Sequence, residues 1–292
     1  MRVLVTGTGG QVGSEVARAL AGRAEVFAHD RRTLDLMHPE TIASRVREAK
    51  PDVIVNCAAY TAVDRAESEV EAAHQVNGVA PAVLAEEAGR VGALLVHFST
   101  DYVFDGTKGS PYAEADTPNP VNAYGATKLE GERAIAASGC DHAILRTSWV
   151  FGPHGKNFML TMLKLAQTRE ELRIVDDQRG APTSSAQLAR LVRDLLDLGL
   201  GRLRAESGLY HATAAGATTW RGFADAIFAA RAARDASFRV PRVVPIATSD
   251  YPTPARRPAN SVLSCEKLAA RLGVRIPDWH AGLEEALSAL PQ

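Results

Sequence analysis

Short β-branched segments alternate with longer segments rich in Ala, Leu, Glu and Arg through the first half of the chain. The short segments are apolar almost throughout, as in the Val-Ile-Val run at 53–55 and the Leu-Leu-Val run at 94–96. Strands of this kind are buried on both faces of a sheet, and strands that alternate with helices are joined by crossovers and run parallel. The pattern therefore predicts an α/β fold built on a doubly wound parallel sheet.

The same alternation predicts the bounds of the elements. The expected strands are residues 3–6, 25–29, 52–56, 93–99 and 142–148, and the helices between them are 12–21, 39–49, 70–91 and 123–137. Beyond residue 150 the pattern loosens to four expected helices, 157–167, 185–198, 220–234 and 265–272. Stretches rich in Pro, Gly and Thr separate them and suit loops that line a cleft rather than a second regular sheet. We therefore expect a large domain over residues 1–150 and a smaller, loop-rich lobe over 151–292, between which the chain can cross more than once.

Length and charge exclude several classes of protein. The 292 residues suffice for one large or two modest domains. The 33 Lys and Arg residues against 34 Asp and Glu residues leave a formal charge of −1, without the basic excess that a nucleic-acid partner needs. No apolar run approaches the ~20 residues of a membrane helix, and no signal peptide is recognisable. Cys57, Cys140 and Cys265 lack metal-ligand spacing and are expected to be small buried groups in a reducing compartment, which indicates a cytoplasmic protein.

Three glycines lie between the end of the first expected strand and the first turn of the first expected helix. Gly7, Gly10 and Gly13 follow a GxxGxxG spacing rather than the commoner GxGxxG. Glycines here permit a tight turn, and the helix N-terminus offers amide hydrogens to a pyrophosphate. The alternative is a turn that only packs helix on strand, but Asp30 closes the second strand, where a carboxylate can accept the ribose hydroxyls of an adenosine. Residues 1–150 are therefore expected to form an NAD(P)-binding domain of the Rossmann type.

The choice between NADH and NADPH stays open in the sequence. Asp30 favours the cofactor without a 2′-phosphate, whereas Arg31 and Arg32 can pair with that phosphate or lie on a solvated loop. Residues 56–61 end the third strand with small side chains, which leave room for a ligand or only pack the sheet against helices. The expected cofactor-binding residues are Gly7, Gly10, Gln11, Val12, Gly13, Asp30, Arg31, Asp35, Leu36, Ala58, Ala59, Tyr60, Thr61, Tyr124 and Lys128.

A phenol and an ammonium group lie four residues apart in the helix expected over 123–137. Tyr124 and Lys128 share one helix face, and the fourth strand ends beside Thr100. Because a free tyrosine ionises near ~10, a nearby ammonium that lowers this pKa makes the phenol a workable general acid or base. Thr100 can donate a hydrogen bond to a carbonyl oxygen as it gains charge. The alternative for the pair is a surface contact worth a few tenths of a kcal/mol.

Taken together, the glycine turn, the strand-end Ser-Thr and the Tyr-x-x-x-Lys pair resemble the extended short-chain dehydrogenase/reductase superfamily. Its catalytic triad is Ser/Thr, Tyr and Lys, so the resemblance implies these roles for Thr100, Tyr124 and Lys128. Seven further segments are similar to the dTDP-4-dehydrorhamnose reductase family: 10–13, 63–67, 99–104, 146–150, 177–183, 251–255 and 257–261. They span almost the whole chain, and the last ones lie in the substrate half.

The resemblance implies reduction of the C4 ketone of dTDP-4-dehydro-L-rhamnose to dTDP-L-rhamnose by hydride transfer from NADPH or NADH. Tyr124 would protonate the new alkoxide, Lys128 would hold the nicotinamide ribose, and Thr100 would position the ketone. The expected substrate-binding residues are Val63, Asp64, Thr100, Asp101, Tyr124, Trp149 and Arg257. Trp149 can face a deoxysugar or be a core residue, and Arg257 can pair with the diphosphate or be solvent-exposed.

Two kinds of alternative function remain open. A nucleotide-sugar 4-epimerase or dehydratase of the same superfamily shares the triad. Dehydratases follow the threonine with an Asp-Glu pair, whereas Asp101 is followed here by Tyr102. A non-catalytic NAD(P)-binding regulatory subunit would show degraded catalytic positions, and all three are present here.

The resemblance also bears on metal and assembly. Some members of the family bind Mg²⁺ between subunits through glutamates in two late helical segments. The corresponding positions here are Ala186 and Ala289, which cannot ligate a cation. We therefore predict no metal ion, and expect either a monomer or a homodimer.

Overall fold

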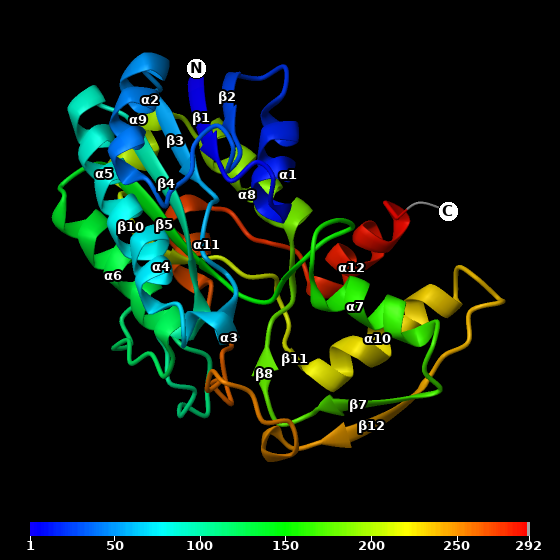
Figure 1. Ribbon diagram of the computed structural model, residues 1–292. Coiled ribbons are helices and arrows are strands. Elements are labelled where there is room, and N and C mark those ends of the chain that lie inside the picture. The colour runs from blue at the N-terminus through cyan, green and yellow to red at the C-terminus, as the bar shows by residue number, and fades with distance from the viewer. Residues whose placement is uncertain (291–292) are drawn as a thin grey trace.

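The computed structural model describes residues 1–290 and contains a six-stranded parallel sheet with helices packed against it (Figure 1). Its strands are β1 (Arg2–Thr6), β2 (Glu25–His29), β3 (Val53–Asn56), β4 (Leu94–Thr100), β5 (His142–Thr147) and β10 (Gly208–His211), in the order β10-β5-β4-β3-β1-β2. The helices against it are α1 (Gln11–Leu20), α2 (Ile42–Ala49), α5 (Ala80–Val91), α6 (Ala123–Ala137), α8 (Ser185–Asp197) and α9 (Leu200–Ala205). The predicted doubly wound parallel sheet is confirmed. The bounds of its five predicted strands agree to within one residue, whereas α2 begins three residues later than predicted.

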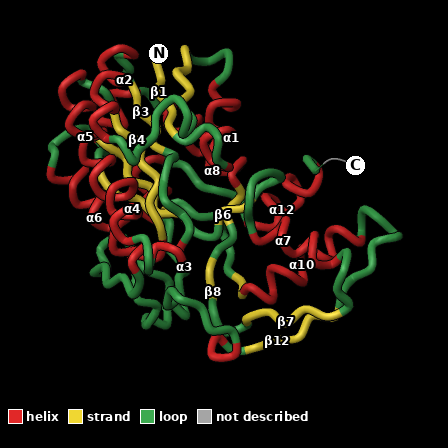
Figure 2. Tube along the Cα trace, in the orientation of Figure 1, coloured by secondary structure: helices red, strands yellow, loops and turns green. Residues whose placement is uncertain are grey.

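Both faces of the sheet are apolar, as the strand composition predicts. Val3 and Val5 of β1 point to one face, where α1 and α8 cover the sheet. Leu4 points to the opposite face, which α2, α5 and α6 cover. Figure 2 shows helices on either side of the strands. Alternation along each strand therefore supplies two hydrophobic layers from one sheet.

The chain reverses its direction across the sheet at β1. From β1 it crosses to β2 on one side and then returns to β3 on the other. Where these crossovers diverge, the ends of β1 and β3 come close together: a Cβ on Gly7 would lie 2.7 Å from the Ala58 nitrogen. Open α/β sheets bind ligands at such a switch point, outside the carboxyl ends of the strands.

A π-helical turn interrupts the helix predicted over 70–91. It is η2 (Gln75–Val79), between α4 (Val70–His74) and α5. Its Asn77 accepts a hydrogen bond from the Tyr60 nitrogen (2.9 Å) and donates one to the Tyr60 carbonyl (3.1 Å). The turn therefore fixes the loop that follows β3, just before the short helix α3 (Val63–Ala66).

The remaining elements build a smaller lobe beside the sheet (Figure 1). They are β6 (Val150–Phe151), α7 (Phe158–Ala166), β7 (Glu171–Val175), β8 (Arg179–Gly180), β9 (Thr183–Ser184), β11 (Thr218–Thr219), α10 (Trp220–Ala232), β12 (Arg242–Ile246) and α12 (Trp279–Ser288). Helix α11 (Glu266–Leu272) instead packs against β10 of the main sheet. The strands pair as β7–β12, β8–β11 and β6–β9. We expected loops here rather than a second regular sheet, and the structure adds these three two-stranded pairs to the loops. Neither these pairs nor β10 of the main sheet were predicted from the sequence.

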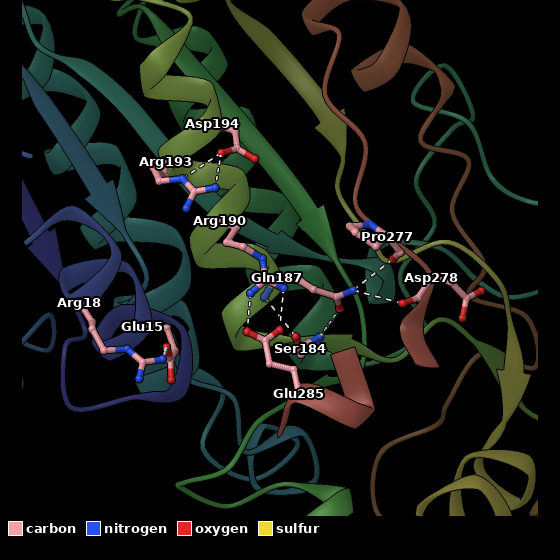
Figure 3. Close-up of polar contacts among 10 residues, drawn as sticks. All are labelled: Glu15, Arg18, Ser184, Gln187, Arg190, Arg193, Asp194, Pro277, Asp278 and Glu285. Carbon is pink, nitrogen blue, oxygen red and sulfur yellow. Dashed lines mark hydrogen bonds and ion pairs between the residues drawn. The ribbon is translucent and has the colours of Figure 1, made fainter. Parts of the chain in front are cut away.

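Polar contacts join α8 to α12, as Figure 3 shows. Gln187 caps α8 together with Ser184, and its side-chain amide also donates to the Pro277 and Asp278 carbonyls at 3.2 and 3.3 Å. One turn later, Arg190 donates to both carboxylate oxygens of Glu285 at 2.5 and 2.7 Å. These contacts attach the smaller lobe to the helix that covers the main sheet.

The same region holds one of the two alanines that bear on metal binding. Ala186 lines a shallow notch with Glu15, Arg18, Arg190 and Glu285. Each glutamate there pairs with one of the arginines. Within residues 1–290 no group of three or more His, Cys, Asp or Glu side chains lies close enough to hold a metal ion. The absence of a metal stays a prediction.

Candidate active site

A cleft of about 1100 Å³ runs along the carboxyl ends of the strands, from the glycine turn to the beginning of the smaller lobe. Its lining includes nearly all of the predicted site residues: Gly7, Gly10, Gln11, Val12, Asp30, Arg31, Asp35, Leu36, Ala58, Ala59, Tyr60, Thr61, Val63, Thr100, Asp101, Tyr124, Lys128 and Trp149. Gly13, Asp64 and Arg257 are not part of the lining. Residues far apart in the sequence therefore meet in one elongated cleft.

The three glycines of the glycine turn are needed for different structural reasons. Gly7 has a φ of +69°, which side chains rarely adopt. Gly13 lies beneath the turn, where a Cβ would come within 2.3 Å of the Gly7 carbonyl oxygen. Gly10 is the N-cap of α1, and no side chain of the described residues caps this helix end. The amides of the first turn can therefore serve a pyrophosphate, so the residues present fit a dinucleotide.

Acidic and basic side chains gather at the end of β2. The Asp30 carboxylate accepts hydrogen bonds from the Arg32 side chain (2.9 Å) and backbone (3.0 Å), which lower its pKa. Arg31 donates to Asp35 at 3.2 Å. Both arginines remain largely exposed beside the cleft. This arrangement suits either the free adenosine ribose of NADH or the 2′-phosphate of NADPH.

Helix α6 carries the phenol and the ammonium group towards the end of β4. Asn122 caps the helix by accepting from the Gly125 nitrogen at 2.8 Å. A Cβ on Gly125 would lie 2.1 Å from the Tyr102 carbonyl oxygen, so only glycine allows this close approach. As a result Tyr124 lies next to Tyr102, with ring centroids 5.9 Å apart, and close enough to Thr100 for the threonine hydroxyl to influence the pKa of the phenol.

Our expectation that Lys128 lowers the pKa of Tyr124 is wrong in this structure. Loss of surrounding water raises the pKa of Tyr124 to about 12, although the nearby Thr100 hydroxyl acts in the opposite direction. The Lys128 ammonium instead donates to the Phe98 carbonyl (2.7 Å) and faces His97, and burial lowers its pKa to about 8. Tyr124 therefore keeps its proton at neutral pH, as a proton donor must.

Asp101 is a buried carboxyl group next to Thr100. Its Oδ1 accepts from the Thr100 hydroxyl at 3.1 Å, whereas its Oδ2 is buried without a partner among the described residues. Burial raises the pKa of Asp101 to about 7, against the opposing influence of the nearby Thr100 and Ser261 hydroxyls. The group is therefore partly protonated near neutral pH.

We expect the stability of Asp101→Asn, relative to the wild type, to be greater at pH 8 than at pH 5. The folded state holds the Asp101 proton more tightly than the unfolded state, so the stability from this group is complete below about pH 4 and is lost as the pH rises towards 7. Thermal unfolding at both pH values measures the difference. Asp105→Asn is the control, because hydrogen bonds from Thr107 and Asn119 lower the pKa of Asp105 and its effect is constant over this range. Equal shifts of Asp101→Asn at both pH values would contradict the prediction.

Two tryptophans close the far end of the cleft. Trp149 has a φ of +47° and stacks on Trp220, with ring centroids 3.6 Å apart and an interplanar angle of 6°. A Cβ on Gly180 would lie 2.4 Å from the Trp149 ring. Trp149 is only partly buried and lines the cleft, so it is not a core residue. The pair offers a broad apolar surface.

Arg257 is neither solvent-exposed nor part of the cleft lining. Its guanidinium group donates to both carboxylate oxygens of Asp64 at 2.8 and 3.1 Å, which lowers the pKa of Asp64. It also donates to the Thr253 hydroxyl at 2.5 Å. The contact fastens the proline-rich loop to α3, and an ionic contact between Arg257 and a substrate diphosphate stays a prediction.

Several cleft residues were not among those we expected. No local sequence pattern predicts that Trp220 lines the cleft, because it reaches the cleft by stacking on Trp149, which is far away in the sequence. Thr147 ends β5, Ser148 follows it, and both line the cleft, so the strand-end rule that found Thr100 could also have found them. Among the cysteines only Cys140 is buried, whereas Cys57 and Cys265 are half-buried; Cys57 lines the cleft. No helix within residues 1–290 is long and apolar enough to cross a membrane.

The sheet, the glycine turn and the Thr–Tyr–Lys constellation define an NAD(P)-dependent oxidoreductase of the extended short-chain dehydrogenase/reductase class. The family model for the RmlD substrate binding domain matches residues 1–291. The chain belongs to this family.

Known relatives agree with this assignment. A dTDP-4-dehydrorhamnose reductase of Burkholderia thailandensis is 56% identical over 96% of this chain and 95% of its own length. The crystal structure of a dTDP-4-dehydrorhamnose reductase from Clostridium acetobutylicum has a TM-score of 0.91, with 39% identity and 99% coverage of both chains. That of Bacillus anthracis, in complex with NADP, has a TM-score of 0.90, with 35% identity and 98% coverage of both.

Proposed function

We propose that this chain reduces the C4 ketone of dTDP-4-dehydro-L-rhamnose to dTDP-L-rhamnose with NADPH or NADH. The observation that carries the proposal is one continuous cleft that holds the glycine turn at one end and Thr100, Tyr124 and Lys128 further along. The relatives named for this reaction match over nearly the whole chain.

Each catalytic residue of the cleft has a separate role in the proposed reaction. Bound NAD(P)H supplies the hydride for C4. The Thr100 hydroxyl donates to the ketone oxygen and stabilises its growing charge. Tyr124, still protonated at neutral pH, gives its proton to the resulting alkoxide. Lys128 would hold the nicotinamide ribose.

Substrate contacts come from both sides of the cleft. The Trp149 face suits a 6-deoxysugar, and Asp101 suits a sugar hydroxyl as a hydrogen-bond partner. Val63 and Asp64 of α3 would lie near the sugar, and Arg257 would leave Asp64 to pair with the diphosphate. In this scheme residues 1–150 hold the cofactor and 151–292 mainly the sugar. We place the reaction in the cytoplasm, in a monomer or a homodimer.

The purified protein is expected to oxidise NADPH or NADH only when dTDP-4-dehydro-L-rhamnose is made enzymatically in the same tube. Absorbance at the nicotinamide band follows the reaction, and comparing the two cofactors shows which one the Asp30 and Arg32 loop prefers. Omission of the sugar is the control. No oxidation with either cofactor would exclude the reductase. Tightly retained NAD without net oxidation would instead identify an epimerase.

A further inference from the structure

A row of polar side chains crosses the interior of the sheet beside the active site. Thr6 lies opposite Asn56, and Asn56 opposite His97, on the adjacent strands β1, β3 and β4. Two residues earlier on the same face, the corresponding row is Leu4, Ile54 and Leu95. All three polar side chains are at most 1% exposed. Burying a polar group costs free energy unless the group is hydrogen-bonded. The three buried polar side chains therefore need hydrogen-bond partners.

Hydrogen bonds connect this row, hereafter the Thr6–Asn56–His97 row, to the ammonium group of Lys128. The Thr6 hydroxyl donates to Asn56 Oδ1 at 2.6 Å, and Asn56 Nδ2 lies 2.9 Å from His97 Nδ1. The other ring nitrogen, His97 Nε2, lies 3.2 Å from Lys128 Nζ. Lys128 is itself 1% exposed and donates to the Phe98 carbonyl at 2.7 Å.

Counting donors shows that the row can adopt two arrangements. A neutral imidazole has one donor and one acceptor. When Asn56 Nδ2 donates to His97 Nδ1, the proton sits on Nε2 and can only be donated to a neutral Lys128 amine. When the Asn56 amide turns over, His97 Nδ1 donates to Oδ1, and Nε2 accepts from a Lys128 ammonium.

The end of the row permits this reversal. A threonine hydroxyl donates and accepts equally well, so Thr6 can serve either face of the Asn56 amide. It already accepts from the Ala58 nitrogen at 3.3 Å. Burial and the neighbouring Lys128 lower the pKa of His97 well below its usual range, which keeps the ring neutral in both arrangements.

The other titratable groups near Lys128 form hydrogen bonds or ion pairs with other residues, or carry no charge at neutral pH. On its own helix, Glu132 accepts from Ser99 and pairs with Arg146 of β5, and Tyr124 keeps its proton. Asp101 after β4 bonds with Thr100, and burial raises the pKa of the Cys57 thiol after β3. The exposed pair His74–Glu130 joins α4 to α6 at the surface. His97 is thus the side chain whose ring nitrogen lies within hydrogen-bond distance of Lys128 Nζ in this structure.

We propose that His97 is a positioning residue whose tautomer follows the protonation of Lys128, with Asn56 and Thr6 as the reversible end of the row. The row holds Nζ in place in either charge state, so Lys128 can lose and regain a proton without moving. The importance of this role for catalysis rests on the proposed function. The coupling between the His97 tautomer and the protonation of Lys128 does not, because it is a property of the folded chain.

The test measures the titration of Lys128 without substrate, so that its outcome is independent of the proposed reaction. The chain has six lysines (Lys50, Lys108, Lys128, Lys156, Lys164 and Lys267), and NMR of ¹³C-ε-lysine-labelled protein can follow each one, with Lys128→Arg assigning the signal. His97→Phe removes an acceptor and should lower the pKa of Lys128 by about one pH unit. In Asn56→Asp the carboxylate accepts from His97 Nδ1, which leaves Nε2 as an acceptor for the Lys128 ammonium. Because the substitution also adds negative charge, it should raise the pKa of Lys128 by a similar amount.

His97→Gln retains an amide acceptor and should restore most of the wild-type pKa. Thermal unfolding of each variant establishes that it folds, and Asn56→Asp and His97→Gln keep the proposal testable if His97→Phe does not. Opposite shifts in His97→Phe and Asn56→Asp support the coupling. A pKa of Lys128 that is unchanged in the folded variants, or shifts in one direction only, would overturn it whatever the reductase assay shows.

Discussion

Replacing Tyr124 by phenylalanine is expected to lower kcat by a factor of about 10² to 10⁴, the usual contribution of a positioned general acid. The substitution removes the phenol hydroxyl, which is the assigned proton donor, but keeps the ring. The ring's edge contact with Tyr102, at 5.9 Å between centroids, should therefore persist. KM for the nucleotide sugar should change much less than kcat, because the proton is transferred only as the alkoxide forms. Steady-state oxidation of NADPH or NADH measures both constants.

Tyr102→Phe is the matched control for this variant. It removes a phenol hydroxyl from the adjacent ring, and we expect its kcat to stay within about tenfold of the wild type, since no proton transfer is assigned to it. Both variants should unfold at nearly the same temperature as the wild type. Native-level kcat in Tyr124→Phe would exclude this tyrosine as the proton donor.

Glu132→Gln should have the largest effect on stability, lowering the free energy of unfolding by about 3 to 5 kcal/mol. Glu132 forms two hydrogen bonds with Arg146, at 2.8 and 2.6 Å, and both side chains are at most 4% exposed. Ser99 donates a third bond to the same carboxylate at 2.5 Å. Removing the charge leaves the buried guanidinium group without its counter-ion. Urea unfolding followed by circular dichroism measures the loss.

Glu130→Gln on the same helix is the control for the stability prediction. Its carboxylate pairs with His74 at 2.7 Å, but both side chains are more than 40% exposed, so the loss should stay below about 1 kcal/mol. Replacing both Glu132 and Arg146 by leucine should cost less than Glu132→Gln alone, because neither charge is then left unpaired. Equal losses in Glu132→Gln and Glu130→Gln would show that the buried pair contributes little.

The sequence was sufficient where local pattern determines structure. β-branched runs predicted the first five strands of the sheet, and the strand-end rule together with helical spacing brought Thr100, Tyr124 and Lys128 into one cleft. β10 escaped because its four residues have no periodicity, and their position depends on pairing with β5, more than sixty residues earlier.

The errors at the site have a similar cause. Spacing shows that Lys128 lies one turn from Tyr124, but not that its hydrogens are directed to Phe98 and His97. The pKa of Tyr124 is consequently set by its surroundings rather than by its helix neighbour. Trp220 likewise enters the cleft through the packing of α10, which no local signal in the sequence indicates.

The position of β10 has a consequence for cutting the chain. β10 pairs with β5 along one edge of the sheet, and α8 covers the apolar face above β1. A fragment that stopped at residue 150 would expose the backbone hydrogen-bonding groups of β5 and leave Val16 and Leu20 in contact with water. Such a fragment would aggregate, so residues 1–150 need later segments of the chain to complete both their sheet and their hydrophobic core.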